Sequence, residues 1–487
     1  MSYAAAVDHL YALGHELAPA APSAPRRKFD LDHMRVLAAA LGGPQTTFPS
    51  VLIAGTNGKG STAATLASIL TAAGYRTGLY TSPHLIRVNE RVQIDGTAIG
   101  DEDFASLYFQ VDETARRLVE AGELPHPPSF FEVLTALAFL YFAGNKADMG
   151  VKADPVDIAI LEVGLGGRLD ATNIVDPLLS ILTDIALDHQ DYLGDTIAEI
   201  TREKAGILRP NGTLITLPQH PEANQAIGEA AATLNLRAIS AANFVPHLRP
   251  RSADSSMSDE LTDEGSLPRN HYAVTLNGEL LEIDSPLSGD HQQRNIGLAI
   301  AAAIELRNLN GHNLAQNDLT RNYGGYKITN AAIEAGIRNT KWPGRLERLT
   351  FPEGPSLLLD VAHNPAGAWT LRAAIAQLPD SQPRTLLFSC LRDKDLKEIS
   401  QILFPLFDAT GDRPRDHILF APIDNPRATS LDSLVAAALA LDVPALTATD
   451  LAAALAMARA ITPPDGLIVA TGSVYLVGEV RRLAVQV

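Results

Sequence analysis

The stretch VLIAGTNGKGST, residues 51–62, brings together glycines, a lysine and three hydroxyl residues. Such turns bind phosphate, because backbone N–H groups and the lysine surround its oxygens while a hydroxyl meets Mg²⁺. The spacing departs from the standard G-x-x-x-x-G-K-[ST] pattern: Gly55 lies too close to Gly58, and Lys59 is followed by Gly60. The stretch is therefore either a nucleotide site of a different kind or a glycine-rich turn.

The flanking residues favour a nucleotide site. Val51–Ala54 is an apolar run typical of a buried parallel strand, and apolar residues recur at helical spacing from Leu66 to Ala73. A strand, a glycine turn and a helix N-terminus bring backbone N–H groups and the positive end of the helix dipole to one point. Ser61 is then an early helical residue whose hydroxyl could face a metal ion.

Two further candidates end predicted strands, where open α/β sheets build their sites. Glu162 ends DIAILE and His189 closes IALDH. A carboxylate at that edge can bind Mg²⁺, although Glu162 could instead pair with Arg168. His189 alone is a weak signal, and it gains weight because it shares the sheet edge with Glu162.

A third strand end carries Ser82 in YTSPHL. A Ser before Pro is commonly a turn residue. Arg87 and Arg91 follow, and they could hold a substrate carboxylate or form a solvated charged loop. Lys204, in TREKAGILRP, has the periodicity of a surface helix residue.

Asp360 and His363, in LLLDVAHNPAG, follow a strand in the second half of the chain and precede a helix that starts with Pro. This pair could bind the nucleotide from its other side. Closure of two domains over the nucleotide would exclude water from a reactive phosphorylated intermediate.

Strand-like runs at 77–80, 157–163, 178–187 and 212–217 alternate with helical patterns, among them a buried helix at 129–143. This alternation predicts a doubly wound, mostly parallel α/β sheet. After a Pro-Gly pair at 343–344, strand-like and helical runs alternate again.

These patterns define a larger nucleotide-binding domain over 1–338, a linker at 339–346 and a smaller α/β domain over 347–487, with the nucleotide in the cleft between the domains. The polar residues 245–270 are expected to be a mobile insertion without chemistry.

The net charge of -17 disfavours non-specific binding to nucleic acid or to an anionic membrane. The single Cys390 excludes an internal disulfide and a cysteine-based zinc site. The N-terminal residues lack the basic region of a signal peptide, and no apolar run is long enough to span a membrane. We expect a soluble, cytoplasmic protein.

The following motifs occur in order over nearly the whole chain: AGTNGKGS, TSPHL…NER, ILEVGLGGRLDATN, IALDH, REKAGI, DHQQRNIGLA, WPGRLE, DVAHNP and TGSVYLVGEV. Taken together, they resemble the motifs of the folylpolyglutamate synthase/dihydrofolate synthase family of the Mur ligase superfamily. That superfamily has a compressed G-T-N-G-K-G-[ST] phosphate loop.

The resemblance implies a role for each matching residue. Lys204 corresponds to a lysine that the family carries as a carbamate (N6-carboxylysine), and His363 would position phosphate or the incoming amine. The ATP-binding set would be Thr56, Asn57, Gly58, Lys59, Gly60, Ser61, Asn295, Arg345 and Asp360. The Mg²⁺ set would be Ser82, Glu162 and His189, with Ser61 nearby. The pterin-side set would be Phe29, Asp30, Leu31, Ser82, Ser129, Leu169, Asp170 and Ala171.

The implied activity is ATP-dependent addition of L-glutamate to dihydropteroate, to reduced folates or to both, through an acyl phosphate, with release of ADP and phosphate. Relatives are often monomers, which is also the expectation for this chain. Two other readings stay open: a small-molecule kinase, which needs no amine substrate, and a nucleotide-dependent binding module without chemistry.

Overall fold

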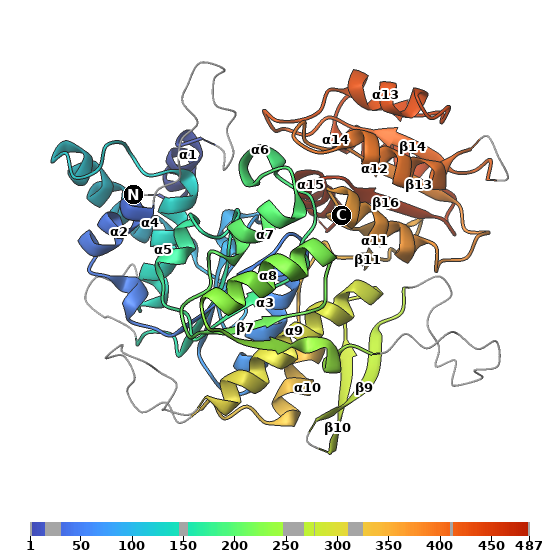
Figure 1. Cartoon of the computed structure of the whole chain (residues 1–487). Helices are drawn as coiled ribbons and strands as arrows, with labels where there is room; N and C mark the ends of the chain where they lie inside the picture. Colours follow the sequence, from blue (N-terminus) through green and yellow to red (C-terminus); the bar gives the residue numbers. More distant parts are fainter. Residues whose placement is uncertain are drawn as a thin grey trace. The chain divides into compact units, whose positions relative to one another are not determined.

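The computed structural model describes residues 2–14, 31–145, 154–246, 267–276, 278–309, 325–409 and 413–485 (Figure 1). The chain divides into two compact units. The first comprises 1–245, 274–281 and 294–340, and the second comprises 246–273, 282–293 and 341–487. Most of the expected insertion at 245–270 lies outside the described residues, which include only 245–246 and 267–270 of it.

The first unit is built on an eight-stranded sheet in the order β4-β3-β2-β5-β1-β6-β7-β8. Strands β2, β5, β1, β6, β7 and β8 are parallel, while β3 and β4 pair antiparallel at one edge. The strands are β1 (Ser50–Ala54), β2 (Thr77–Tyr80), β3 (Val92–Ile94), β4 (Thr97–Ala98), β5 (Ile158–Glu162), β6 (Leu179–Leu182), β7 (Thr213–Thr216) and β8 (Arg237–Ser240).

Helices cover this sheet, as the alternating pattern predicts. They are α1 (Tyr3–Ala12), α2 (Leu31–Ala40), α3 (Lys59–Ala72), α4 (Asp101–Glu120), α5 (Phe130–Phe142), α6 (Gln190–Leu193), α7 (Ile197–Ala205), α8 (Pro221–Thr233) and α10 (Asn330–Arg338). Short 3₁₀ helices are η1 (Pro44–Thr46), η2 (Val88–Arg91), η3 (Ala171–Ile174) and η4 (Ala241–Phe244). A separate hairpin of β9 (Asn270–Leu276) and β10 (Glu279–Ser285) precedes α9 (Asp290–Asn308), and the chain passes between the units within these elements.

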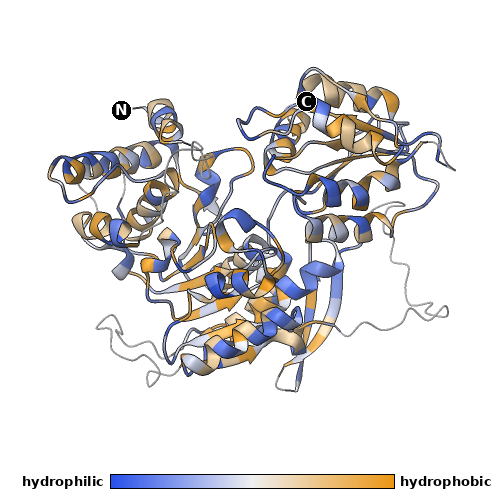
Figure 2. Ribbon diagram, turned by 45° about the horizontal axis from the view of Figure 1, so that its top comes forward, coloured by the Kyte–Doolittle hydropathy of each residue, from blue (hydrophilic) through white to orange (hydrophobic). Residues whose placement is uncertain are grey.

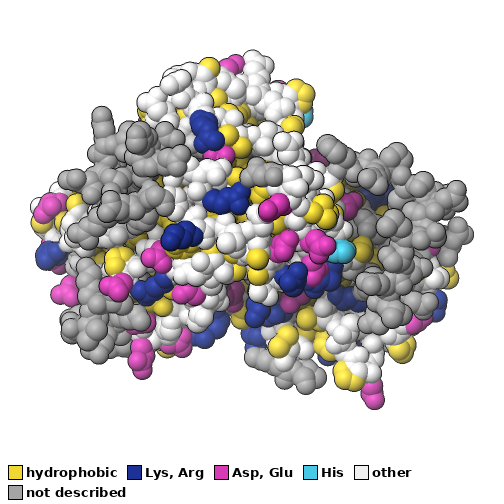
Figure 3. Space-filling view, turned by 90° about the horizontal axis from the view of Figure 1, so that it is seen from below, with side chains coloured by type: hydrophobic (Ala, Val, Ile, Leu, Met, Phe, Trp, Pro, Cys, Tyr) yellow, Lys and Arg dark blue, Asp and Glu magenta, His cyan; other side chains and the backbone are white. Residues whose placement is uncertain are grey.

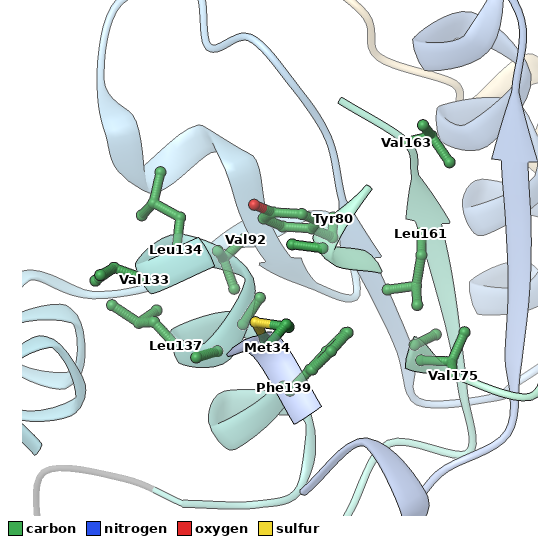
Figure 4. Close-up of a cluster of buried hydrophobic side chains, with 14 of the residues drawn as sticks. Met34, Tyr80, Val92, Val133, Leu134, Leu137, Phe139, Leu161, Val163 and Val175 are labelled. Atoms are coloured by element: carbon green, nitrogen blue, oxygen red, sulfur yellow. The ribbon is translucent and has the colours of Figure 1, made fainter. Parts of the chain in front are cut away.

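The core of the first unit explains why α5 is apolar on all sides. Ten of its residues are buried, and a helix that is buried all round needs no polar face. Figure 4 shows side chains from α2, α5, β2 and β5 in this core, among them Met34, Leu137, Tyr80 and Leu161. The prediction of a buried helix at 129–143 is confirmed.

The second unit carries a six-stranded sheet in the order β11-β12-β16-β13-β14-β15, parallel except for β11. Its strands are β11 (Glu347–Leu349), β12 (Ser356–Leu359), β13 (Arg384–Phe388), β14 (His417–Phe420), β15 (Leu446–Thr447) and β16 (Leu467–Thr471). Its helices are α11 (Pro365–Ile375), α12 (Leu396–Leu403), η5 (Phe404–Phe407), α13 (Leu431–Leu439), α14 (Leu451–Ile461) and α15 (Val474–Val485). The predicted α/β architecture is confirmed.

The strands of both sheets are largely hydrophobic, whereas polar residues lie on the outer faces of the helices (Figure 2). On the face seen in Figure 3, acidic and basic side chains are interspersed rather than separated by sign. Within the described ranges, no helix has the length and hydropathy required to cross a membrane.

Candidate active site

The glycine turn joins β1 to α3 and opens at the helix N-terminus. Gly58 is the N-cap of α3 and has a φ of +86°, a left-handed conformation that favours glycine. Among the residues that the structure describes, no side chain caps α3. The N–H groups of an uncapped first turn form a ready anion site, because they point along the positive end of the helix dipole.

Two lysines converge on this turn. Lys59 Nζ donates to the carbonyl oxygens of Gly55 (3.2 Å) and Thr56 (3.1 Å), and Lys204 Nζ donates to the same Gly55 oxygen (2.7 Å). Lys204 is only 4% exposed, so the prediction of a surface position is wrong. Helical periodicity missed it because the face of α7 that carries Lys204 covers the glycine turn instead of facing water.

The segment after β6 holds the turn from the other side. The carbonyl oxygen of Asp184 accepts the N–H groups of Thr56 (2.8 Å) and Asn57 (3.1 Å). Thr56 Oγ1 donates to Ala186 O and accepts from Ala186 N, both at 3.1 Å. The predicted strand at 178–187 is therefore too long. β6 ends at Leu182; Thr183 N still donates to Ala54 O of β1, and at Asp184 and Ala186 the backbone bonds to the turn instead.

The expected metal ligands lie at one sheet edge, because β2, β5, β1 and β6 are adjacent and parallel. Glu162, 4% exposed, accepts the backbone N–H of Ser82 at 3.1 Å. His189 begins α6 in a left-handed conformation, with its Nε2 3.8 Å from the Asp188 carboxylate. Arg168, the other partner considered for Glu162, forms a salt bridge with Glu203 at 2.9 Å.

Glu162 and the Ser82 hydroxyl are oxygen ligands of the kind that Mg²⁺ prefers, whereas His189 would add a nitrogen ligand. Mg²⁺ is commonly held by one or two carboxylates together with water and substrate phosphate. In the described ranges, no three His, Cys, Asp or Glu side chains gather closely enough to hold a metal ion by themselves. An ion at the Glu162 edge would therefore complete its coordination with phosphate oxygens and water.

Asn295, on α9, lies directly against the turn. A Cβ atom added to Gly58 would be 2.1 Å from Asn295 Oδ1, and Asn295 is only 4% exposed. The structure thus brings this predicted ATP-binding residue to the phosphate loop, although more than two hundred residues of sequence separate them.

In the second unit, Asp360 follows β12 and organises the turn before α11. Its carboxylate accepts the N–H groups of Leu346 (2.9 Å) and Ala362 (3.0 Å). Burial raises the pKa of Asp360, although the positive charge of Arg345 and these two N–H groups lower it. His363 Nδ1 lies 2.8 Å from Val361 O. The structure therefore groups Arg345, Asp360 and His363 within this unit.

Comparisons with known proteins identify two Mur ligase domains in the chain. Residues 144–303 match the Mur ligase middle domain, and residues 344–474 match the Mur ligase glutamate ligase domain. The chain is 33% identical over 458 residues to the dihydrofolate synthase/folylpolyglutamate synthase of Bacillus subtilis, covering 93% of this chain and 94% of that protein. The chain belongs to the folylpolyglutamate synthase/dihydrofolate synthase family.

Solved structures of this family have the same fold. Mycobacterium tuberculosis folylpolyglutamate synthase, complexed with ADP and AMPPCP, is 30% identical with a TM-score of 0.77, over 99% of this chain and 98% of that one. Escherichia coli FolC, in complex with DHPP and ADP, is 28% identical with a TM-score of 0.73, over 100% of this chain and 98% of that one.

The structure describes only some of the residues that are expected to bind the pterin. Phe29 and Asp30 lie outside the described residues, and Leu31 begins α2. Ser129 is the N-cap of α5, and its hydroxyl donates to Glu132 at 2.6 Å. The side chain of Ser129 thus caps a helix, and its predicted contact with substrate stays a prediction.

The carboxylate of Asp170, which lies between Leu169 and Ala171, accepts hydrogen bonds from residues of its own loop. It accepts the N–H groups of Gly164, Leu165 and Thr172 (3.0 Å each) and the Thr172 hydroxyl (2.6 Å). Burial raises the pKa of Asp170, and these hydrogen bonds oppose that rise. Asp170 therefore shapes the loop after Glu162, and the predicted substrate role of Leu169, Asp170 and Ala171 stays untested.

The loop after Ser82 is a supported structure rather than a solvated one. Arg91 is 2% exposed, donates from Nε to His84 Nδ1 at 2.9 Å and lies over the Phe130 ring. Burial, and then the charge of Arg91, hold the pKa of His84 well below its usual value. The solvated-loop reading is therefore wrong for Arg91, while the half-exposed Arg87 pairs with Asp101 at 2.7 Å.

Helix α1 supports the same loop through two tyrosines. Tyr3 OH donates to Asn89 Oδ1 at 2.5 Å, and Tyr11 OH lies 3.2 Å from His84 Nε2. Sequence reasoning missed His84, because a histidine after Pro in a turn carries no periodic signal; its contacts come from α1 and from Arg91.

Proposed function

We propose that this chain uses Mg²⁺ and ATP to join L-glutamate to dihydropteroate, to reduced folates or to both. As a member of its family it is an ADP-forming carbon–nitrogen ligase. The observation that carries the assignment is the convergence of Lys59 and Lys204 on the Gly55 carbonyl at the uncapped start of α3, in a chain that matches this family along nearly its full length.

The reaction requires activation, because oxide is too poor a leaving group for an amine to displace from a carboxylate. The pterin-borne carboxylate attacks the γ-phosphate of ATP, which gives an acyl phosphate and ADP. The amine of glutamate then attacks the acyl carbon and expels phosphate. Lys59 and the N-terminus of α3 stabilise the charge that develops on the transferred phosphoryl group, and loss of one such donor typically costs about 3 kcal/mol of barrier.

Glu162, Ser82 and His189 would hold Mg²⁺, with Ser61 next to its phosphate side. When bound, the ion would supply charge neutralisation on the phosphate oxygens. The hydrogen bond from Ser82 N to Glu162 keeps the carboxylate directed along the sheet edge.

Carbamylation of Lys204 has a physical reason at this site. The two lysine ammonium groups share one carbonyl oxygen, so their nitrogens are separated by about 6 Å or less, a distance at which like charges repel. A carbamate on Lys204 would replace that repulsion with attraction and would add an oxygen ligand. Mass spectrometry of the intact protein in bicarbonate buffer, with Lys204→Ala as the control, tests the modification.

We further propose that Thr56, Asn57, Gly60 and Asn295 bind ATP from the first unit while Arg345, Asp360 and His363 act from the second. Residues 1–338 and 347–487 would be the two functional domains, with 339–346 as the linker. The pterin would lie near Phe29, Asp30, Leu31, Ser129 and Leu169–Ala171.

One assay tests the reaction. ADP release is measured with dihydropteroate or tetrahydrofolate, with and without L-glutamate, and the products are identified by mass. We expect turnover and a glutamylated product only when glutamate is present. A kinase would release ADP without glutamate, and a binding module would turn over very slowly under all conditions.

Lys59→Ala should abolish turnover while the fold is retained. Lys327→Ala, at an exposed lysine of the same unit, is the matched control and should keep wild-type activity. Full activity of Lys59→Ala would remove the glycine turn from the mechanism.

A further inference from the structure

An ion pair at the start of α9 supports the phosphate loop indirectly. Arg294 donates to Asp184 with two nitrogens: Nε lies 2.9 Å from Oδ2, and Nη2 lies 2.5 Å from Oδ1. Arg294 Nη2 also donates to Pro218 O at 3.0 Å. This bidentate geometry fixes direction as well as distance, which a single contact between charges does not.

Asp184 connects this pair to the loop through its main chain. Its carbonyl oxygen accepts the N–H groups of both Thr56 and Asn57, as an isolated bridge between the loop and the segment after β6. The carboxylate held by Arg294 and the carbonyl held by the loop belong to one residue. The orientation of the Arg294 side chain therefore limits how far the loop backbone can move.

The neighbouring residue reinforces this arrangement. Asn295 follows Arg294 on α9, and its side chain fills the space beside Gly58 at the other end of the turn. Consecutive residues of one helix thus restrain the loop at two points, at the Thr56–Asn57 peptide and at Gly58.

We infer that Arg294 and Asp184 are positioning residues that hold the phosphate loop in the geometry that binds the nucleotide, an inference that rests on the proposed function of that loop. Neither residue needs to touch ATP. Binding sites lose affinity when their groups are misplaced by as little as 1 Å, because part of the interaction energy must then reorder the loop.

The exposure of the Arg294–Asp184 pair distinguishes a role in positioning the loop from a role in stabilising the fold. The side chains of Arg294 and Asp184 are 32% and 39% exposed. Ion pairs of this exposure contribute little to the free energy of unfolding, because water and salt screen them. Loss of the pair should therefore change nucleotide affinity more than it changes the melting temperature.

The test is a double-mutant cycle with Arg294→Ala, Asp184→Ala and the double variant. Two quantities are measured: KM for ATP in the complete ligase assay, and the Kd for ADP by calorimetry. We expect each single variant to raise both values by about 3- to 10-fold, since tenfold in affinity corresponds to about 1.4 kcal/mol. The double variant should be no weaker than the weaker single variant, because both changes remove one interaction.

Two matched variants complete the experiment. Arg294→Lys keeps the charge but loses the bidentate geometry, so its Kd for ADP should lie between those of wild type and Arg294→Ala. Arg116→Ala breaks a comparable pair on α4, with Asp112 at 2.7 Å, and should leave both nucleotide constants unchanged.

The outcomes distinguish this inference from the proposed function. If the wild type binds ADP and the single variants bind it equally well, or if the two substitutions act additively, the positioning role is refuted. A lower melting temperature with an unchanged KM for ATP and an unchanged Kd for ADP also refutes the positioning role. If the wild type binds ADP but shows no glutamate-dependent turnover, the proposed function fails while the calorimetric cycle still decides the inference. A wild type that binds no ADP overturns both.

Discussion

Substitution of Gly58 by alanine tests the packing between the phosphate loop and α9. Gly58 has a φ of +86°, and an added Cβ would lie 2.1 Å from Asn295 Oδ1 and 3.0 Å from Asn295 Cγ. Asn295 is short and buried, so it cannot simply rotate into solvent. Gly58→Ala therefore imposes both backbone strain and a collision.

A control at the other end of α3 separates the two contributions. Gly74, just past the C-terminus of α3, has a φ of +89°, and a Cβ there would meet no atom of the described residues within 4 Å. Gly74→Ala should cost only the left-handed strain, about 1–2 kcal/mol. Gly58→Ala should cost the same strain plus about 1–3 kcal/mol for overpacking.

Equilibrium urea unfolding measures both free energies. Asn295→Ala in the Gly58→Ala background removes the colliding oxygen, so the additional cost of the alanine should disappear. The Kd for ADP should rise in Gly58→Ala and stay at the wild-type value in Gly74→Ala. If Gly58→Ala destabilises the protein no more than Gly74→Ala does, the close approach of α9 to the loop is wrong.

Three other predictions concern the sheet edge and its supporting loops. Glu162→Gln keeps an acceptor for Ser82 N but loses the negative charge. The Mg²⁺ concentration that gives half-maximal activity should therefore rise at least about tenfold. An unchanged Mg²⁺ titration would exclude Glu162 as a ligand. Asp170→Ala leaves four donors without their acceptor, two of them buried on Thr172 and two partly buried on Gly164 and Leu165. It should lower the free energy of unfolding by about 3 kcal/mol, with a smaller loss in Asp170→Asn, which keeps one acceptor oxygen. Because the folded pKa of His84 is depressed, the unfolded chain binds a proton that the folded chain does not. Stability should therefore fall as the pH drops below about 6.5, by up to about 1.4 kcal/mol per pH unit, and His84→Gln should remove that part of the slope in urea titrations at several pH values.

The parts of the site that were predictable share one physical origin. The carboxyl ends of adjacent parallel strands meet at one edge, so Ser82, Glu162 and the glycine turn could be grouped from the strand pattern before their contacts were known. The fold class followed from the same alternation, because strands and helices alternate where crossover connections build a parallel sheet.

The features that local sequence patterns did not predict depend on contacts between separate segments. Lys204 has the local pattern of a surface position, and only the packing of α7 over Gly55 buries it. The residues TDIAL after Leu182 look like a continuing strand, yet the Asp184 carbonyl accepts hydrogen bonds from the loop. Arg91 looks like a solvated charge, but His84 and Phe130 enclose it. In each case the partner lies in a separate segment that local periodicity does not register.

The attachment of α1 to the loop after Ser82 has a practical consequence for anyone preparing this protein. Tyr3 and Tyr11 contact Asn89 and His84, so the first helix supports the loop after Ser82 although it lies far from it in the sequence. Trimming the amino terminus to aid crystallisation would withdraw both supports, and a purification tag is better fused at the opposite end of the chain.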